Sequence, residues 1–183
     1  MSDSVLSFLL GLIQGLTEFL PISSSAHLLL PSLLFGLNDL GLSFDIAVHA
    51  GTLIAVIYYF RGEILLMSKS FFKNDEYLLI HRNLAFSLII ATIPVVFAGL
   101  FLKDIIEQRI FSIEHIAIAN IIFAGILLFA YLNKKNKKNL YSITLYSALF
   151  IGIFQSLALF PGASRSGTAI TAALLIGINL KDA

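Results

Sequence analysis

The chain has 183 residues, of which 58% are hydrophobic and 13% charged, and its formal net charge is +1. With a mean hydropathy of +0.92, this composition excludes an ordinary soluble domain and argues against nucleic acid as a partner. The absence of cysteine excludes disulfides and cysteine-ligated zinc. We therefore expect an integral membrane protein surrounded by membrane lipids.

Seven apolar runs follow one another along the chain, and their lengths divide them into two kinds. A helix needs roughly 20 residues to cross the hydrocarbon core of a bilayer. Three runs approach or reach that length, and each is predicted to be a transmembrane helix: 44–60, 83–102 and 115–132. The other four runs form two pairs, each interrupted by a proline. These pairs are 5–20 with 26–37, around Pro21, and 141–160 with 168–178, around Pro161.

Each interrupted pair is predicted to be a re-entrant hairpin that dips to the middle of the membrane and returns. Proline favours the break because it cannot donate to the helix hydrogen-bond ladder. Polar turns at membrane depth are tolerated mainly where they line a cavity. An alternative for 141–160 is a full span, since its length suffices. The predicted fold is an all-α polytopic membrane protein with two re-entrant helix-turn-helix hairpins.

The two hairpins are similar in sequence and are predicted to be inverted relative to each other. GLIQGLTEFLPISSSAH (11–27) and GIFQSLALFPGASRSGT (152–168) both run from an apolar helix through a proline and serines into a second helix. Basic residues concentrate in 61–82 and 134–138, whereas 103–114 is mixed, so the positive-inside rule places the first two segments in the cytoplasm. Because three spans separate the hairpins, they start from opposite sides, as in an inverted-topology repeat.

Residues 1–183 are interpreted as a single membrane domain that contains this repeat. Residues 1–132 form the first repeat, made of a re-entrant hairpin over 5–37 and three spans. Residues 139–183 begin the second repeat with the other hairpin. Since a complete second repeat needs about three further spans, we expect the sequence to be a C-terminally truncated piece of a longer protein.

The first turn carries ionisable and hydroxyl side chains in an apolar surrounding. Gln14 and Glu18 are four residues apart and share one face of a helix, and an ionisable group inside a membrane marks a functional site by default. A histidine close to the serines can act as general acid, general base or nucleophile near neutral pH. The polar residues after the proline are Ser23, Ser24, Ser25 and His27.

The second turn combines glycines, hydroxyls and one arginine at the start of an apolar helix. A helix N-terminus presents free N–H groups and a partial positive charge, which can hold an anion. Arg165 adds a planar fork that suits two phosphate oxygens. These residue types predict a phosphate cradle. Its predicted members are Gly162, Ser164, Arg165, Ser166 and Thr168, with Ser23 and Ser25 from the first turn.

Glu18 needs a proton, a cation or Arg165 to be tolerable inside a membrane. With a phosphate also present, a divalent cation, Mg²⁺ or Ca²⁺, that bridges carboxylate and phosphate oxygens is the economical solution. Glu18 and Gln14 are the predicted protein ligands. Asp45, His49 and Asn120 are interpreted as supporting or packing groups.

The two motifs together resemble those of the undecaprenyl-diphosphate phosphatases of the bacitracin-resistance type. They are QGLTEFLPISSSAH (14–27) and PGASRSGT (161–168), and the resemblance covers essentially the whole chain. It implies a multi-pass hydrolase of the bacterial inner membrane that removes the terminal phosphate of undecaprenyl diphosphate. The product is the monophosphate carrier of peptidoglycan synthesis. The resemblance also implies an inverted-repeat fold and an active site that opens to the periplasm.

Within this family resemblance, the E/Q-x-x-x-E motif falls on Gln14 and Glu18. The PGxSRSxxT motif begins at Pro161, but its threonine falls on Ala169, whereas Thr168 lies one residue earlier. Our hypothesis is that Arg165 and the N–H groups of 162–168 bind the diphosphate, and that Glu18 with Gln14 positions a divalent ion or the attacking group. His27 and Ser24 then provide nucleophilic attack or proton transfer. The attacking atom, on His27, Ser24 or water, stays open at this point.

One alternative from another functional class is a transporter or lipid-carrier flippase, because inverted hairpins around a mid-membrane anion site are also a transport design. A phosphatase of the acid-phosphatase-like lipid family is disfavoured, since its basic motif ending in Arg-Pro is absent. The sequence leaves the prenyl chain length, the identity of the metal and the formation of a homo-oligomer open.

Overall fold

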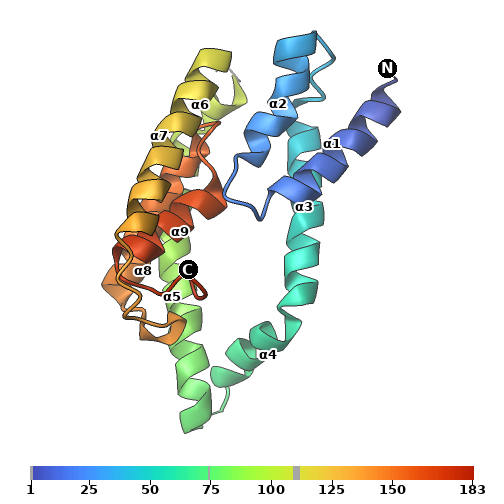
Figure 1. Cartoon of the computed structure of the whole chain (residues 1–183). Coiled ribbons are helices and arrows are strands. Elements are labelled where there is room, and N and C mark those ends of the chain that lie inside the picture. Colours follow the sequence, from blue (N-terminus) through green and yellow to red (C-terminus); the bar gives the residue numbers. More distant parts are fainter. Residues whose placement is uncertain (1, 74, 109–111) are drawn as a thin grey trace.

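The computed structural model describes residues 2–73, 75–108 and 112–183, and the regular elements in these ranges are helices. Figure 1 shows them as two groups of helices joined near their middle and at one end. The elements are α1 (Asp3–Thr17), α2 (Ser24–Phe35), α3 (Gly41–Tyr59), α4 (Arg61–Ser70), α5 (Glu76–Phe101), α6 (Lys103–Glu107), α7 (Ile113–Leu132), η1 (Leu140–Ser142), α8 (Leu145–Ser156), η2 (Leu157–Leu159) and α9 (Arg165–Leu175).

Three helices are long and apolar enough to cross a membrane, and they are α3, α5 and α7. They coincide with the three predicted spans, which confirms the prediction of an all-α polytopic membrane protein. The predicted start of the second span at residue 83 was too late. The side chain of Asp75 accepts a hydrogen bond from the N–H of Tyr77 and caps α5. The helix therefore also includes the polar residues that precede the apolar run.

The remaining apolar helices are shorter, and they fall in the two interrupted pairs. They are α1, α2 and the stretch Leu145–Leu159. The stretch Leu145–Leu159 extends over about 22–24 Å at 1.5–2.0 Å per residue, whereas the hydrocarbon core is about 30 Å thick. Length therefore disfavours the alternative in which 141–160 crosses the membrane as one helix.

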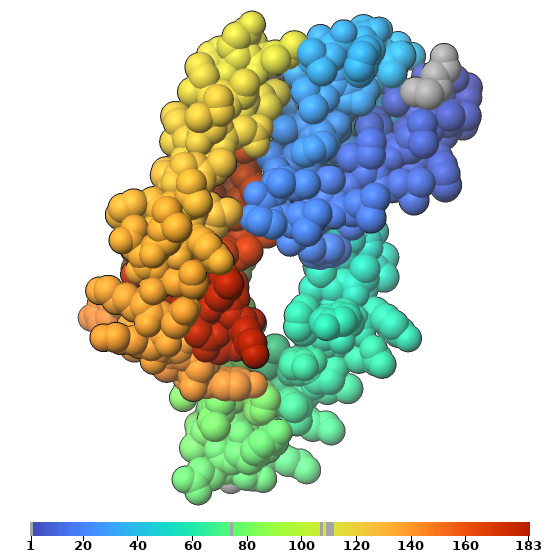
Figure 2. All heavy atoms as spheres, in the orientation of Figure 1, coloured from blue at the N-terminus to red at the C-terminus, as the bar shows by residue number. Residues whose placement is uncertain are grey.

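Each group of helices has its own packing. Leu6, Leu10 and Leu28 form a buried cluster that holds α1 and α2 against the start of α3. In the other group, α5 packs along α8, while α7 and α8 pack against α9. Figure 2 shows an opening between α3 and the C-terminal segment. Large apolar side chains face outward, and Phe101 is 84% exposed, as expected for helices that contact lipid rather than water.

Close approach of α8 to α5 depends on a glycine. A Cβ atom added to Gly152 would lie 2.3 Å from the carbonyl oxygen of Ala91, whereas one added to Gly11 would meet no described atom within 4 Å. Small residues let membrane helices approach this closely. The two glycines occupy equivalent positions in the two similar segments, so only the second copy uses its glycine for tight packing.

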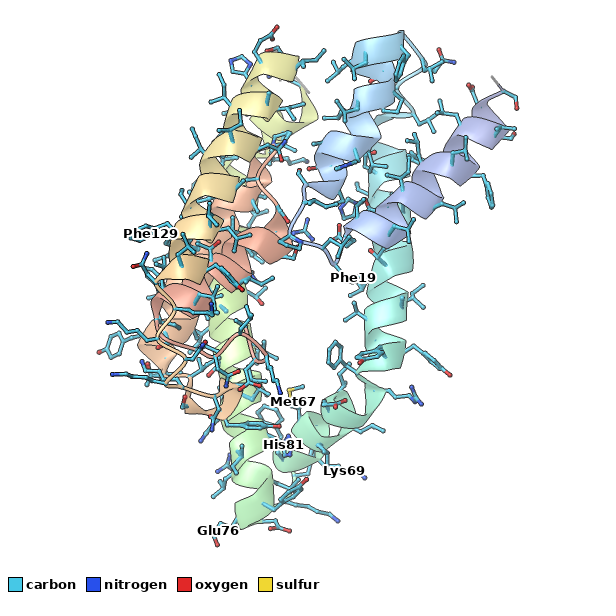
Figure 3. The ribbon with its side chains drawn as sticks, in the orientation of Figure 1. Phe19, Met67, Lys69, Glu76, His81 and Phe129 are labelled. Atoms are coloured by element: carbon cyan, nitrogen blue, oxygen red, sulfur yellow. The ribbon has the colours of Figure 1, made fainter. Side chains whose placement is uncertain are left out.

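The two ends of the molecule differ in their helices and in their content of basic residues. Figure 1 places α4 at one end and α6 at the other, with α5 between them. Figure 3 shows Met67, Lys69, Glu76 and His81 at the α4 end, and Phe19 well away from them, at the turn between α1 and α2. His81 is buried there, with its ring edge-on to that of Tyr77 at 5.4 Å between centroids. The basic segments 61–82 and 134–138 thus lie toward the end opposite α6.

Candidate active site

The proline turns of the two similar segments meet in space. The backbone N–H of Gly162 donates to the Ser23 hydroxyl at 3.1 Å, across a sequence separation of 139 residues. The Ser166 hydroxyl donates to the carbonyl oxygen of Leu20 at 2.6 Å. Figure 1 shows the turn between α1 and α2 reaching the start of α9. Polar groups from both segments therefore share one location.

Ser23 has two structural tasks in the first turn. Its side chain accepts a hydrogen bond from the N–H of Ala26 at 3.3 Å and thereby caps α2, which begins at the next residue. The residue is only 2% exposed. Since the same oxygen accepts from Gly162, Ser23 ties the start of α2 to the second turn.

The second turn needs glycine at position 162. Gly162 has a φ of +101°, and an added Cβ atom would lie 2.6 Å from the carbonyl oxygen of Ile116 in α7, so both backbone conformation and space exclude a larger residue. Two residues later, the Ser164 hydroxyl accepts from the N–H of Gly167 at 3.1 Å and caps α9. Arg165 consequently occupies the first position of α9.

Glu18 is the centre of the polar contacts. Its Oε2 atom accepts hydrogen bonds from Gln14 Nε2 at 2.8 Å and from the Ser24 hydroxyl at 2.6 Å. Its Oε1 atom lies 3.6 Å from Arg165 Nη1. The Glu18 side chain is 14% exposed and that of Arg165 is 60% exposed. The structure thus brings together the carboxylate of the first segment and the guanidinium of the second.

These side chains border a cavity of about 370 Å³. Six of the residues predicted from the sequence lie on its wall, together with apolar residues of both hairpins. A cavity with a few convergent polar groups and an apolar lining is typical of a small-molecule site. The six are Glu18, Ser23, Ser24, Ser25, Ser164 and Arg165.

The other predicted site residues lie beside this cavity and not on its wall as far as the described residues show. Gln14 is fully buried behind Glu18. Gly162 and Ser166 bond to the first turn, and the Thr168 hydroxyl donates to the carbonyl of Arg165 at 2.9 Å. His27 places Nδ1 2.7 Å from the carbonyl oxygen of Ser23. The contacts of these residues hold the turns in place.

Two residues of α3 that sequence reasoning treated as supporting groups line the cavity, namely Asp45 and His49. His49 Nε2 lies 3.5 Å from Glu18 Oε2, so the imidazole nearest the carboxylate comes from α3 and not from the serine turn. A signal was available in the sequence. The two residues are four apart, on one face of an apolar span, and ionisable groups in such spans usually mark a functional site.

The donor set near Glu18 fits a divalent cation. Gln14 Oε1 is buried without a hydrogen-bond partner in the described part of the chain, although Nε2 of the same amide contacts Glu18. Carboxylate and amide oxygens are the ligands that Mg²⁺ and Ca²⁺ prefer. Within residues 2–73, 75–108 and 112–183, no three His, Cys, Asp or Glu side chains form a metal cluster, so other ligands would come from substrate or water.

A second, smaller cavity of about 280 Å³ adjoins the turns on the side of α7. Ile22 and Ser164 border both cavities. The walls of the smaller one are mainly apolar, with Phe123 and Leu127 from α7. An apolar chain attached to a polar head would find a matching environment there.

Comparison with known proteins shows which family and which relatives this chain is similar to. The family model described as "Bacitracin resistance protein BacA" matches residues 7–183. An undecaprenyl-diphosphatase of Saccharophagus degradans is 47% identical over 186 aligned residues, which cover 99% of this chain and 69% of that protein. Undecaprenyl-diphosphatase 1 of Pseudoalteromonas translucida is 46% identical over 181, covering 95% and 66%. The chain thus spans about two thirds of the length of these relatives.

Proposed function

Because the chain belongs to the bacitracin resistance protein BacA family, we propose that it hydrolyses undecaprenyl diphosphate to undecaprenyl phosphate and inorganic phosphate. This reaction recycles the lipid carrier for peptidoglycan synthesis and counteracts bacitracin. The observation that carries the proposal is the 3.6 Å approach of Arg165 to Glu18 on the wall of one cavity. A diphosphate needs such a cation, and its hydrolysis needs a group that accepts a proton.

Arg165 is the proposed anchor of the terminal phosphate. Its guanidinium is partly exposed at the cavity, so it is accessible to a ligand, and its planar fork can donate to two phosphate oxygens. Phosphoryl transfer depends mainly on positioning and on neutralising negative charge. Arg165 supplies both, while the capped start of α9 adds the partial positive charge of a helix N-terminus.

Ser24 and Glu18 are the proposed nucleophile and base. The Ser24 hydroxyl already donates to Glu18 Oε2 at 2.6 Å, the arrangement of an activated nucleophile. Glu18 takes the proton as Ser24 Oγ bonds to the terminal phosphorus. The bond from that phosphorus to the bridging oxygen breaks, and the released lipid monophosphate receives the proton from Glu18. Water then hydrolyses the phosphoserine, which releases inorganic phosphate and restores the hydroxyl. The geometry supports Ser24 over His27, because Ser24 contacts Glu18 and lies on the cavity wall, whereas His27 is not among the described residues that line the cavity.

A divalent cation is part of the proposal. Glu18 and Gln14, whose Oε1 has no hydrogen-bond partner among the described residues, are the residues that would hold it. When bound, such a cation neutralises charge on the phosphate oxygens. The residues of the chain perform the remaining work, since Arg165 orients the phosphate and Glu18 accepts the proton of Ser24.

The position of the cavity supports an opening to the periplasm. Its wall includes Ile106 of α6 and the residues of α3 nearest the start of that helix, Leu42 and Asp45. Figure 1 places α6 and the first part of α3 toward the end opposite α4, and the positive-inside rule assigns the basic segments near α4 to the cytoplasm. In this proposal α1–α2 and α8–α9 are re-entrant hairpins of an inverted repeat, and the prenyl tail follows the apolar cavity beside α7.

Release of inorganic phosphate from undecaprenyl diphosphate by the purified protein in detergent tests the function. The parent protein should release phosphate, and Arg165→Ala should abolish the release without unfolding the protein. Unchanged release by Arg165→Ala would remove the site assignment. A folded parent protein that binds the lipid but releases no phosphate would favour transport of the lipid instead.

A further inference from the structure

The segment that joins α7 to α8 is held by the residues that follow α9. After α9, Gly177 takes a φ of +92°, which turns the backbone out of the helix. Its carbonyl oxygen accepts hydrogen bonds from the N–H groups of Lys137 at 3.0 Å and Lys138 at 2.9 Å. Figure 1 shows the C-terminal end beside this segment. Residues 134–140 and 177–182 together are called the lysine clip below.

Two polar side chains complete the lysine clip. The N–H of Asn179 donates to the carbonyl oxygen of Lys138 at 2.8 Å. Asp182 Oδ2 accepts from Asn179 Nδ2 at 2.8 Å and from the N–H of Leu140 at 3.1 Å. Asn179 Oδ1 in turn accepts from the N–H groups of Lys181 and Asp182, each at 3.1 Å. Since these contacts use backbone atoms and the side chains of Asn179 and Asp182, no lysine side chain is needed to hold the clip together.

Most lysine side chains of the clip are free to bind a ligand. Four of them are exposed, and their ammonium groups make no hydrogen bond or ion pair within the described residues; they are Lys135, Lys137, Lys138 and Lys181. Lys134 is engaged already, because its Nζ donates to the carbonyl oxygen of Tyr131 at 3.1 Å and lies 3.6 Å from the centre of the same ring. Asp182 is the only carboxylate residue of the clip. The clip thus presents an excess of positive charge.

Two exposed tyrosines place the clip at the surface of the membrane. Tyr131 lies near the end of α7 and is 43% exposed, and Tyr141 follows the clip directly and is 52% exposed. Tyrosine is enriched where the hydrocarbon core meets the lipid headgroups, because its ring is apolar and its hydroxyl polar. α7 is long and apolar enough to cross a membrane, and the clip begins just after it ends. Lysines at this depth extend their ammonium groups to the headgroups.

We propose that the lysine clip is a binding site for anionic phospholipid, whose headgroup phosphate is held by the exposed lysines. Basic residues next to a membrane helix attract anionic lipid, roughly fivefold in affinity for each residue. The hydrogen bonds of the clip add to this attraction, because they hold the lysines together before lipid binds. The site does not depend on the proposed function. Arg165 begins α9 on the side of the cavity, whereas the clip follows the end of that helix.

Quenching of a single tryptophan by brominated lipid reports which lipid lies next to the clip. The chain has no tryptophan, so Tyr141→Trp supplies the only one. This reporter protein is placed in phosphatidylcholine vesicles with increasing fractions of phosphatidylglycerol, and each of the two lipids is brominated in turn. Phosphatidylglycerol should quench more strongly than phosphatidylcholine at equal fraction. Lys137→Gln combined with Lys138→Gln should lower this preference roughly fivefold or more.

Two further variants separate the clip from the general charge of the protein. Lys69→Gln combined with Lys73→Gln removes the same charge from exposed residues outside the clip, and it should change the preference by less than about twofold, because salt screens distant exposed charges. Asn179→Ala keeps every lysine but removes the side-chain contacts that order the clip, so it should also lower the preference. Circular dichroism and thermal midpoints check that each variant is folded.

Four results would overturn the proposal. They are equal quenching by both lipids in the reporter protein, equal losses of preference in the two lysine double variants, an unchanged preference in Asn179→Ala, and loss of the preference when inorganic phosphate replaces chloride at equal ionic strength. The last result would assign the lysines to a free anion instead of a lipid headgroup. Phosphate release from undecaprenyl diphosphate is measured separately, so failure of either proposal leaves the other standing.

Discussion

The N–H of Gly162 donates to the hydroxyl of Ser23, and this 3.1 Å hydrogen bond joins the two proline turns on which the cavity is built. Ser23 also caps α2, and Gly162 holds a backbone conformation that other residues rarely adopt. One contact therefore couples the start of a helix in the first segment to the approach of α9 in the second.

Ser23→Ala should destabilise the protein by about 2–4 kcal/mol, because it removes a helix cap and leaves the buried N–H of Gly162 without a partner. Equilibrium unfolding in detergent measures the change in the free energy of unfolding. Ser32→Ala is a suitable control, since the Ser32 hydroxyl donates only to a carbonyl of its own helix and the substitution should change stability by less than about 0.5 kcal/mol. Equal stability of the two variants would contradict the structural role of Ser23.

Ser24→Ala should reduce phosphate release by several orders of magnitude, because it removes the proposed nucleophile. The neighbouring Ser25→Ala should have a much smaller effect, since Ser25 lines the cavity but its hydroxyl contacts that of Ser23 rather than the Glu18 carboxylate. Single-turnover measurements of phosphate release, with both variants checked for folding, compare the rates of the two variants with that of the parent protein. Near-normal rates in Ser24→Ala would mean that His27 or water, and not Ser24, attacks the phosphorus.

Arg165→Lys should slow phosphate release roughly 10- to 100-fold while the protein stays folded. Lysine keeps the charge but loses the fork, and one lost hydrogen bond to a charged group costs about 1.5–3 kcal/mol. The thermal midpoint should change little, because the Arg165 side chain is 60% exposed and exposed ion pairs add little stability. A large fall in thermal midpoint would instead assign Arg165 a structural role.

Gly152→Ala should destabilise the protein by about 1–3 kcal/mol, because the new methyl group would overlap the backbone of α5 at Ala91. Gly11→Ala, at the equivalent position of the first segment, should be neutral or stabilising by up to about 1 kcal/mol through helix propensity. Unfolding midpoints of the two variants provide the comparison. Similar destabilisation by both would show that α1 packs against another surface in the membrane.

The side on which the cavity opens can be tested with single cysteines, because the chain has none of its own. Ile106→Cys lies on the cavity wall, and a membrane-impermeant maleimide should label it in intact spheroplasts. Lys69→Cys, at the opposite end (Figure 3), should be labelled only after the membrane is opened. The reverse pattern would place the cavity on the cytoplasmic side.

The spans and the meeting of the two turns were predictable from the sequence for different physical reasons. Hydropathy over a bilayer-length window identifies α3, α5 and α7, because apolar runs of that length have few other uses. The similarity of 11–27 to 152–168 predicted that Glu18 and Arg165 lie close together. The start of α5 was missed because capping by Asp75 is local chemistry that an apolar count does not register.

The assignment of individual polar groups could not be read from the sequence. The hydroxyl of Ser166 bonds to the carbonyl of Leu20, whereas the sequence alone suggested that it faces a phosphate. Serine at a helix start suits either role, and only the orientation of the partner turn decides between them. His49 shows the converse, because its distance from Glu18 depends on the packing of α1 against α3.

The separation of Ser23 from Gly162 also has a consequence during biosynthesis. The serine turn leaves the ribosome 139 residues before its partner, which at 5–20 residues per second is a delay of about 7–28 s. Throughout that time the nascent chain carries a polar loop whose hydrogen-bond donor, the N–H of Gly162, has not been made. We expect the loop to wait near the lipid headgroups or against an insertase, so that the catalytic centre forms only after the second turn has been inserted.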